Sequence, residues 1–184
     1  MNLANRLTIA RILVIPVFMA LILSNIPYGD WLAAALFSVA AITDGLDGYI
    51  ARSRKQVTNF GRFLDPVADK LLISAALISL VDLGRLSAWI AMIIIGREIA
   101  VLGLRILAMG EGEIINSSST GKAKTVFQVA AIIAWILRAE MPRGELSTSI
   151  VDFVAVILMG IAIILTIISG LDYYFRSKGI LEKV

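Results

Sequence analysis

Between residues 44 and 69 the chain reads Asp44-Gly-Leu-Asp47-Gly48-Tyr-Ile-Ala51-Arg52, then eight residues, then Gly61-Arg-Phe-Leu-Asp65-Pro-Val-Ala-Asp69. The four aspartates lie at the facing ends of two strongly apolar segments. A carboxylate at membrane depth is costly and usually marks a functional site. Four of them in one short stretch need a shared explanation, and binding of divalent metal ions is the first to consider.

The composition indicates a protein surrounded by lipid. Of the 184 residues, 59% are apolar and 17% are charged, and the mean hydropathy is +0.88. Soluble domains contain roughly 45–50% apolar and about 25% charged residues. Here the apolar residues also form long runs, so we expect membrane-spanning segments.

Six segments have the ~20 mostly apolar residues that a spanning helix needs. They cover approximately 7–25, 31–52, 63–82, 87–109, 122–140 and 149–172. We therefore expect an all-α, polytopic membrane protein with six transmembrane helices, formed by a single domain over residues 1–184. Arg11 interrupts the first apolar run, which favours a retained helix over a cleaved signal peptide, and Pro16 should kink that helix.

The basic residues predict the orientation of this bundle. Three arginines, at 85, 138 and 143, fall on one side of the expected helices. Eleven lysines and arginines fall on the other: Arg6, Arg11, Arg52, Arg54, Lys55, Arg62, Lys122, Lys124, Arg176, Lys178 and Lys183. The positive-inside rule makes the richer side cytoplasmic. We expect a multi-pass protein of the cytoplasmic (inner) membrane, with both termini and the aspartates facing the cytoplasm. Trp135 and Tyr173 fall near predicted helix ends, where amphipathic rings prefer to sit.

The residue types that are missing narrow the chemistry. The chain has no cysteine and no histidine, which removes disulfides, thiolate ligands and the commonest general base. Acid–base and metal chemistry must therefore fall to Asp, Glu, Lys or Tyr. The formal net charge is only +3, and no nucleic-acid partner is expected.

The spacing of the aspartates predicts that they meet. Asp44 and Asp47 share one helix face, and Asp65 and Asp69 share a face of the next helix. Antiparallel packing of the two helices would bring all four together. A set of hard oxygen ligands suits Mg²⁺ or Mn²⁺, and four carboxylates are enough for two ions, as in sites for phosphoryl displacement. Arg52 extends the first of these faces and suits a diphosphate. A divalent-cation carrier is the alternative from another class of protein.

The pattern Asp-x2-Asp-Gly-x2-Ala-Arg-x8-Gly-x3-Asp-x3-Asp resembles the signature of the CDP-alcohol phosphotransferase family at every fixed position. The resemblance implies an integral membrane enzyme with six helices, in which an alcohol displaces CMP from a CDP-linked lipid. By that resemblance three aspartates are metal ligands, and Asp69 is a ligand, the general base, or both. Gly48, Arg52 and Gly61 would line the site of the cytidine diphosphate. The metal ligands so implied are Asp44, Asp47 and Asp65.

Three further stretches bear on the substrates: Asn5-Arg-Leu-Thr8-Ile-Ala-Arg11, Gly96-Arg97-Glu98-Ile-Ala-Val-Leu-Gly-Leu-Arg105 and Gly121-Lys122-Ala-Lys124-Thr125. Charged residues deep in an apolar helix must pair or face a wet cavity, and two lysines at a helix N-terminus attract an anion. We expect Arg105, Lys122 and Lys124 to hold a phosphate on the acceptor, with Arg97 or Arg11 assisting. Asn5 and Thr8 are assigned to binding of the CDP-lipid. A structural ion pair through Glu98 is the alternative for the second stretch, and membrane topology alone is the alternative for the lysines.

Together these stretches resemble the bacterial phosphatidylglycerophosphate synthase branch of that family. The resemblance implies CDP-diacylglycerol and sn-glycerol 3-phosphate as substrates, phosphatidylglycerophosphate and CMP as products, and a homodimer in contact with membrane lipid. Within the family, an acceptor such as inositol phosphate or serine is the alternative. An inactive scaffold is disfavoured because every position of the signature is present.

Overall fold

The computed structural model describes the chain except for residues 1–2, 25, 54–58, 111–118, 141–145 and 182–184. Within the helices, the side chains of residues 3–6, 44–53, 59–63, 65, 119, 140, 146–149 and 179–181 also lie outside the description. All regular elements of the described part are helices, and it contains no strand. Its elements are α1 (Leu3–Leu23), α2 (Gly29–Ser53), α3 (Asn59–Asp82), α4 (Ala88–Gly110), α5 (Ser119–Leu137), the short 3₁₀ helix η1 (Arg138–Glu140) and α6 (Leu146–Leu181).

Each predicted apolar segment corresponds to one helix. The largest difference is at α6, which continues to Leu181, beyond the predicted end at 172. The apolar run ends there, but the helix does not, because Arg176 pairs with Asp172 one turn earlier at 2.9 Å. Such i,i+4 pairs support a helix after its apolar face has ended. α1 continues on both sides of Pro16, and α3 likewise contains Pro66.

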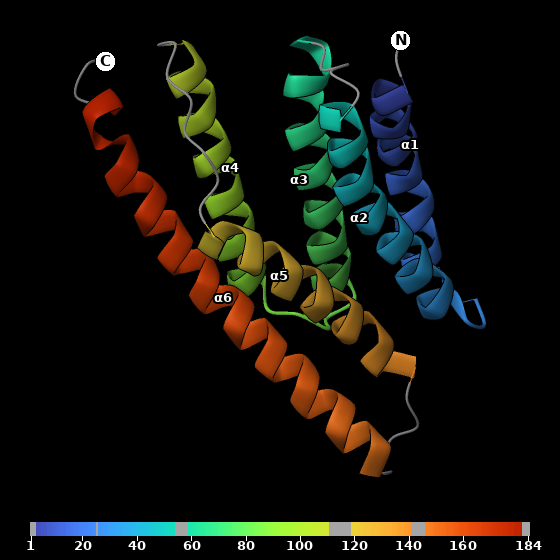
Figure 1. The fold of residues 1–184 in the computed structure, drawn as a ribbon. Coiled ribbons are helices and arrows are strands. Elements are labelled where there is room, and N and C mark those ends of the chain that lie inside the picture. Colours follow the sequence, from blue (N-terminus) through green and yellow to red (C-terminus); the bar gives the residue numbers. More distant parts are fainter. Residues whose placement is uncertain (1–2, 25, 54–58, 111–118, 141–145, 182–184) are drawn as a thin grey trace.

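α1 packs against α2 and α3, and α6 packs against α4 and α5. The start of α1 and the end of α6 lie at the same end of the molecule, near the end of α2 and the start of α3 (Figure 1). α5 begins partway along the bundle, beside α4 and α6 (Figure 1). This arrangement brings the first turns of α5 to the middle of α4.

Small and apolar side chains form the core. Phe18 of α1 and Phe37 of α2 are fully buried, with ring centroids 5.7 Å apart. Buried alanines recur through the helices, among them Ala33, Ala76 and Ala131. Small residues let helix backbones approach closely, as is common between membrane helices.

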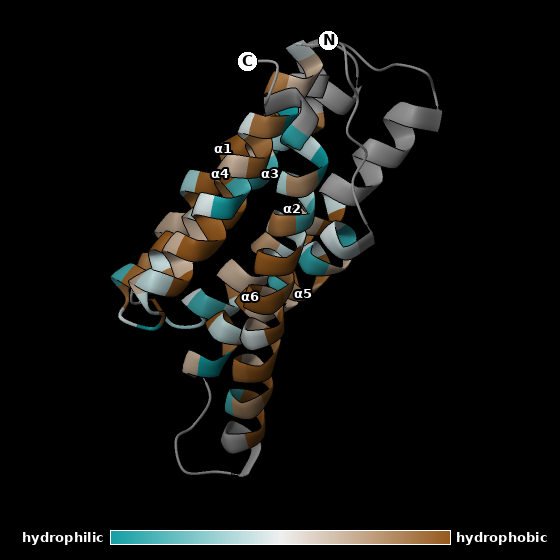
Figure 2. Ribbon diagram, turned by 90° about the vertical axis from the view of Figure 1, so that its left-hand side faces the viewer, coloured by the Kyte–Doolittle hydropathy of each residue, from teal (hydrophilic) through white to brown (hydrophobic). Residues whose placement is uncertain are grey.

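The outer faces of the helices are also apolar. Trp89, Phe153 and Phe175 are each more than 60% exposed, and hydrophobic residues extend along most of α6 (Figure 2). Monomeric soluble proteins rarely expose apolar surface so widely. Among the described residues, two helical segments are long and apolar enough to cross a membrane, Thr120–Leu137 and Ile150–Lys178. α1 and α2 contain shorter apolar segments.

Side-chain contacts fix the end of the bundle at which α3 turns into α4. Gly84 has φ +65°, the left-handed conformation that commonly ends a helix. Arg85 follows and pairs with Asp30 of α2 at 2.7 Å, and Trp135 of α5 donates a hydrogen bond to the Arg85 carbonyl at 2.6 Å. Trp135 is only 8% exposed, so it packs inside the protein rather than standing free at the membrane surface. These contacts fix how α4 returns alongside α3.

Candidate active site

A cavity of about 210 Å³ lies among α3, α4, α5 and α6. Five cationic side chains and two carboxylates line it, which leaves a surplus of three positive charges. Its lining residues are Pro66, Asp69, Lys70, Arg97, Glu98, Val101, Leu102, Arg105, Gly121, Lys122, Lys124, Thr125 and Tyr173. Four of the five residues predicted to hold the acceptor phosphate are thus brought together from two helices, along with the predicted catalytic Asp69.

Glu98 of α4 is the centre of the charge network at this cavity. It is 2% exposed, and its carboxylate pairs with Lys70 of α3 at 2.8 Å and with Lys124 of α5. Arg97 lies 3.2 Å away. Lys124 is also 2% exposed. A buried charge is tolerated only when it is paired, so Glu98 neutralises the interior cations and ties three helices together.

Asp69 lies at the same cavity, next to this network. Its carboxylate pairs with Lys70 at 2.5 Å, and the two side chains are 22% and 25% exposed. Lys70 therefore links Asp69 to Glu98. The carboxylate predicted to act as general base is thus accessible to solvent. Its neighbour on α3, Lys70, holds it in place.

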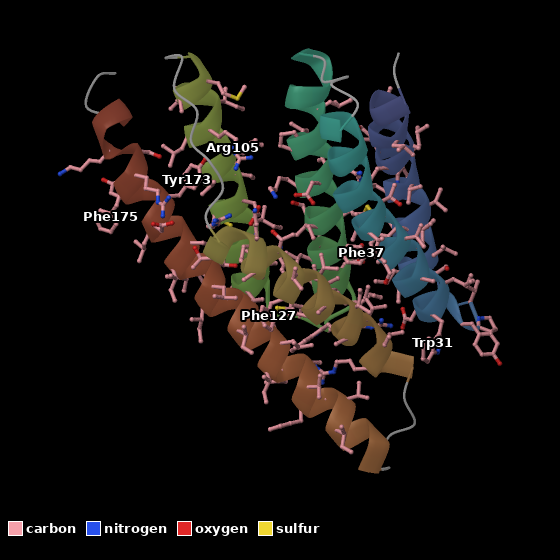
Figure 3. All side chains as sticks on the ribbon, in the orientation of Figure 1. Trp31, Phe37, Arg105, Phe127, Tyr173 and Phe175 are labelled. Carbon is pink, nitrogen blue, oxygen red and sulfur yellow. The ribbon has the colours of Figure 1, made fainter. Side chains whose placement is uncertain are left out.

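The two arginines of α4 contact α6. Arg97 Nη2 donates a hydrogen bond to Ser169 Oγ at 2.9 Å, and Arg105 Nε donates one to Tyr173 Oη at 3.4 Å. Arg105 and Tyr173 lie between α4 and α6 (Figure 3). Tyr173 therefore adds α6 to the lining of the cavity.

Thr8 and Arg11 of α1 are placed elsewhere. They are 1% and 3% exposed. Arg11 borders a separate, mostly apolar cavity of about 120 Å³ between α1 and α2, with Thr43 at its rim. The structure does not bring Arg11 to the cationic cavity with the other predicted phosphate-binding residues.

The remaining predicted residues have described backbones but side chains outside the description. Asn5 belongs to the first turn of α1, and the others belong to the second half of α2 and the first turns of α3, which lie near one end of the bundle (Figure 1). The predicted metal cluster therefore stays a prediction. These residues are Asn5, Asp44, Asp47, Gly48, Arg52, Gly61 and Asp65.

Comparison with known proteins identifies the family. The sequence pattern of CDP-alcohol phosphatidyltransferases matches residues 1–168. The chain belongs to this family. It is 41% identical to the CDP-diacylglycerol–glycerol-3-phosphate 3-phosphatidyltransferase of Bacillus subtilis, over 96% of this chain and 95% of that protein. Proteins of the same name from Rickettsia bellii and Haemophilus influenzae are 39% and 38% identical, each over more than 90% of both chains.

CDP-alcohol phosphatidyltransferases generally depend on a divalent cation. The donor set of this chain fits one, because it supplies carboxylate oxygens and no imidazole or thiolate, and hard cations prefer oxygen. Asp69 is the one member of the set whose side chain is described, and it faces the cavity.

Three residues of the site were not anticipated. Ser169 and Tyr173 carry no motif, and Tyr173 was interpreted as a membrane-interface ring, whereas it is 3% exposed and contacts Arg105. Lys70 follows Asp69 directly, and its position inside a helix was a signal that it must have a partner. For Glu98, the sequence analysis offered a structural ion pair as an alternative, and the structure contains that pair.

Proposed function

We propose that this protein transfers the phosphatidyl group of CDP-diacylglycerol to sn-glycerol 3-phosphate, yielding phosphatidylglycerophosphate and CMP. The observation that carries the proposal is the cationic cavity beside Asp69. An acceptor that bears a phosphate suits five cationic side chains, whereas an uncharged alcohol does not. The names of the relatives agree with this substrate pair.

In the proposed reaction, the acceptor hydroxyl oxygen forms a bond to the β-phosphorus of CDP-diacylglycerol, and the bond from that phosphorus to the CMP oxygen breaks. Asp69 accepts the proton of the hydroxyl. Arg105, Lys122 and Lys124 hold the acceptor phosphate, with Arg97 assisting, so that the hydroxyl is presented in the correct orientation. Lys122 is exposed, whereas Lys124 is tied to Glu98, so we assign the direct grip first to Lys122 and Arg105.

The divalent ions, two Mg²⁺ or Mn²⁺ in this proposal, would be held by Asp44, Asp47, Asp65 and Asp69 and would neutralise charge on the diphosphate and on departing CMP. Gly48, Arg52 and Gly61, with Asn5 and Thr8, are assigned to the CDP-lipid. Arg11 was grouped with the acceptor site, but its place between α1 and α2 favours a separate role.

We further propose that residues 1–184 form one domain, with six helices crossing the cytoplasmic membrane. The site would lie at their cytoplasmic ends, and the enzyme would work as a homodimer. The apolar outer surface supports this placement. A reaction site near the membrane surface lets the acyl chains stay in the bilayer while the head group meets a soluble acceptor.

The test uses purified protein in detergent, CDP-diacylglycerol and radiolabelled glycerol 3-phosphate. We expect lipid-soluble label and CMP in equal amounts with Mg²⁺ or Mn²⁺, and neither with EDTA. Transfer to inositol phosphate or serine but not to glycerol 3-phosphate would overturn the assignment of glycerol 3-phosphate as the acceptor. A divalent-cation carrier would instead move Mn²⁺ into vesicles without forming CMP, and the positive surplus at the cavity disfavours it.

A further inference from the structure

Three residues of α6, namely Ser169, Gly170 and Tyr173, lie against the two arginines of α4, and Tyr173 also lines the cationic cavity. Ser169 and Tyr173 are one helical turn apart, so they share a face of α6. Arg97 and Arg105 are two turns apart on α4. α4 and α6 run in the same direction (Figure 1), which is why Arg97 meets Ser169 and Arg105 meets Tyr173.

The contact at Arg97 is a close fit. Ser169 is fully buried, and its hydroxyl donates to the Leu165 carbonyl at 2.5 Å, which leaves its oxygen lone pairs for Arg97. A Cβ atom added at Gly170 would lie 3.1 Å from Arg97 Cγ. The stem of Arg97 therefore packs directly on the backbone of α6. With Glu98 at its other terminal nitrogen, Arg97 joins α6 to the charge network.

The hydrogen bond to Tyr173 uses the Nε atom of Arg105 and leaves the two terminal nitrogens of the guanidinium available. Tyr173 is 3% exposed, and its hydroxyl accepts from Nε. The guanidinium carbon lies 6.0 Å from the centre of the Tyr173 ring. A guanidinium held through Nε presents its two Nη groups as a fork, the geometry that binds phosphate in a bidentate manner.

We infer that Tyr173 is a positioning residue for the acceptor: it orients Arg105 so that the Nη fork faces the phosphate of glycerol 3-phosphate. The inference rests on the proposed function and deepens it by adding α6 to the acceptor site. Tyr173 acts through Arg105 and does not touch the reacting atoms.

The test compares Tyr173→Phe with Tyr174→Phe. Tyr174 is the next residue on the same helix and is 50% exposed, so its variant controls for loss of a hydroxyl. We expect Tyr173→Phe to raise the KM for glycerol 3-phosphate about 3- to 10-fold, the net effect of losing one typical hydrogen bond. The kcat, the KM for CDP-diacylglycerol and the melting temperature in detergent should stay at wild-type values, as should every parameter of Tyr174→Phe.

A double-mutant cycle separates this role from a structural one. Arg105→Lys removes the fork, so adding Tyr173→Phe to it should change the KM for glycerol 3-phosphate by less than a factor of two, within the usual error of additivity. An unchanged KM in Tyr173→Phe, a full effect on the Arg105→Lys background, or equal rises for both substrates would each overturn the inference. If wild-type protein transfers nothing to glycerol 3-phosphate, the proposed function fails and the inference fails with it.

Discussion

Glu98 is the residue on which the interior charges depend. It is almost completely buried and shares its carboxylate among Lys70, Arg97 and Lys124. The Glu98 carboxylate and the Lys124 ammonium are almost closed off from solvent, whereas the side chains of Lys70 and Arg97 are 25% and 15% exposed. Loss of Glu98 would therefore leave Lys124 buried without its carboxylate partner.

Glu98→Gln should lower the free energy of unfolding by about 3–5 kcal/mol, the usual cost of removing one partner of a buried ion pair. The measurement is thermal unfolding in detergent. Asp172→Asn is the matched control, because Asp172 pairs with Arg176 on an exposed turn of α6 and such pairs contribute about 0–1 kcal/mol. Equal effects of the two substitutions would contradict the central role of Glu98.

Asp69 is the residue with the clearest catalytic assignment. Asp69→Asn keeps the size of the side chain but removes the proton acceptor, so we expect kcat to fall by about 10²- to 10⁴-fold. Initial rates at saturating substrates check this. Asp82→Asn, at the other and exposed end of α3, should leave the rate unchanged. Full activity of the Asp69→Asn variant would show that Asp69 is not the general base.

At the scale of helices, the first turns of α5 separate two lysines that the sequence had grouped. Lys122 is exposed and Lys124 is 2% exposed. Two residues apart on a helix, they point in different directions. Lys124 turns toward Glu98 and the interior, whereas Lys122 remains at the rim of the cavity.

Substitution of the two lysines should therefore have different effects on the KM for glycerol 3-phosphate and on the melting temperature. Lys122→Ala should raise the KM for glycerol 3-phosphate roughly tenfold, as expected for loss of a charged hydrogen bond, without lowering the melting temperature. Lys124→Ala should raise the same KM and also lower the melting temperature, because Glu98 loses a partner. Kinetics and thermal unfolding, measured on the same preparations of both variants, test these two expectations. Identical behaviour of the two variants would contradict this division.

At the scale of the whole molecule, the proposed topology puts both ends of the helical bundle's chain on one side of the membrane. The start of α1 and the end of α6 lie at one end (Figure 1), and the turn between α3 and α4 lies at the other. α6 has 36 residues, which corresponds to ~54 Å, longer than the ~30 Å hydrocarbon core. In the proposed topology, part of α6 would therefore extend beyond the core.

Because the chain has no cysteine, single introduced cysteines can test this topology directly. Ser87 and Lys178 are both exposed and belong to opposite ends of the bundle. In intact cells, a membrane-impermeant maleimide should label Ser87→Cys, and it should label Lys178→Cys only after permeabilisation. Labelling of both positions from outside would contradict a cytoplasmic C-terminus.

Much of the protein was predictable from the sequence because its signals are local. Runs of apolar residues predicted six helices, and the fixed spacing from Asp44 to Asp69 predicted the family. The charged residues inside α4 predicted a partner or a wet cavity, since neither charge is stable alone in an apolar helix. These inferences need only helix periodicity and the cost of burying charge.

Only the tertiary structure decided which charged residues meet. Lys70, Glu98 and Lys124 lie on three different helices, so no spacing along the chain could pair them. The same is true of Arg105 and Tyr173, which are 68 residues apart. Helix packing also placed Arg11 between α1 and α2, away from the cavity it was expected to join. The physical reason is that residue spacing defines the face of a single helix, whereas the packing of helices determines which faces come together.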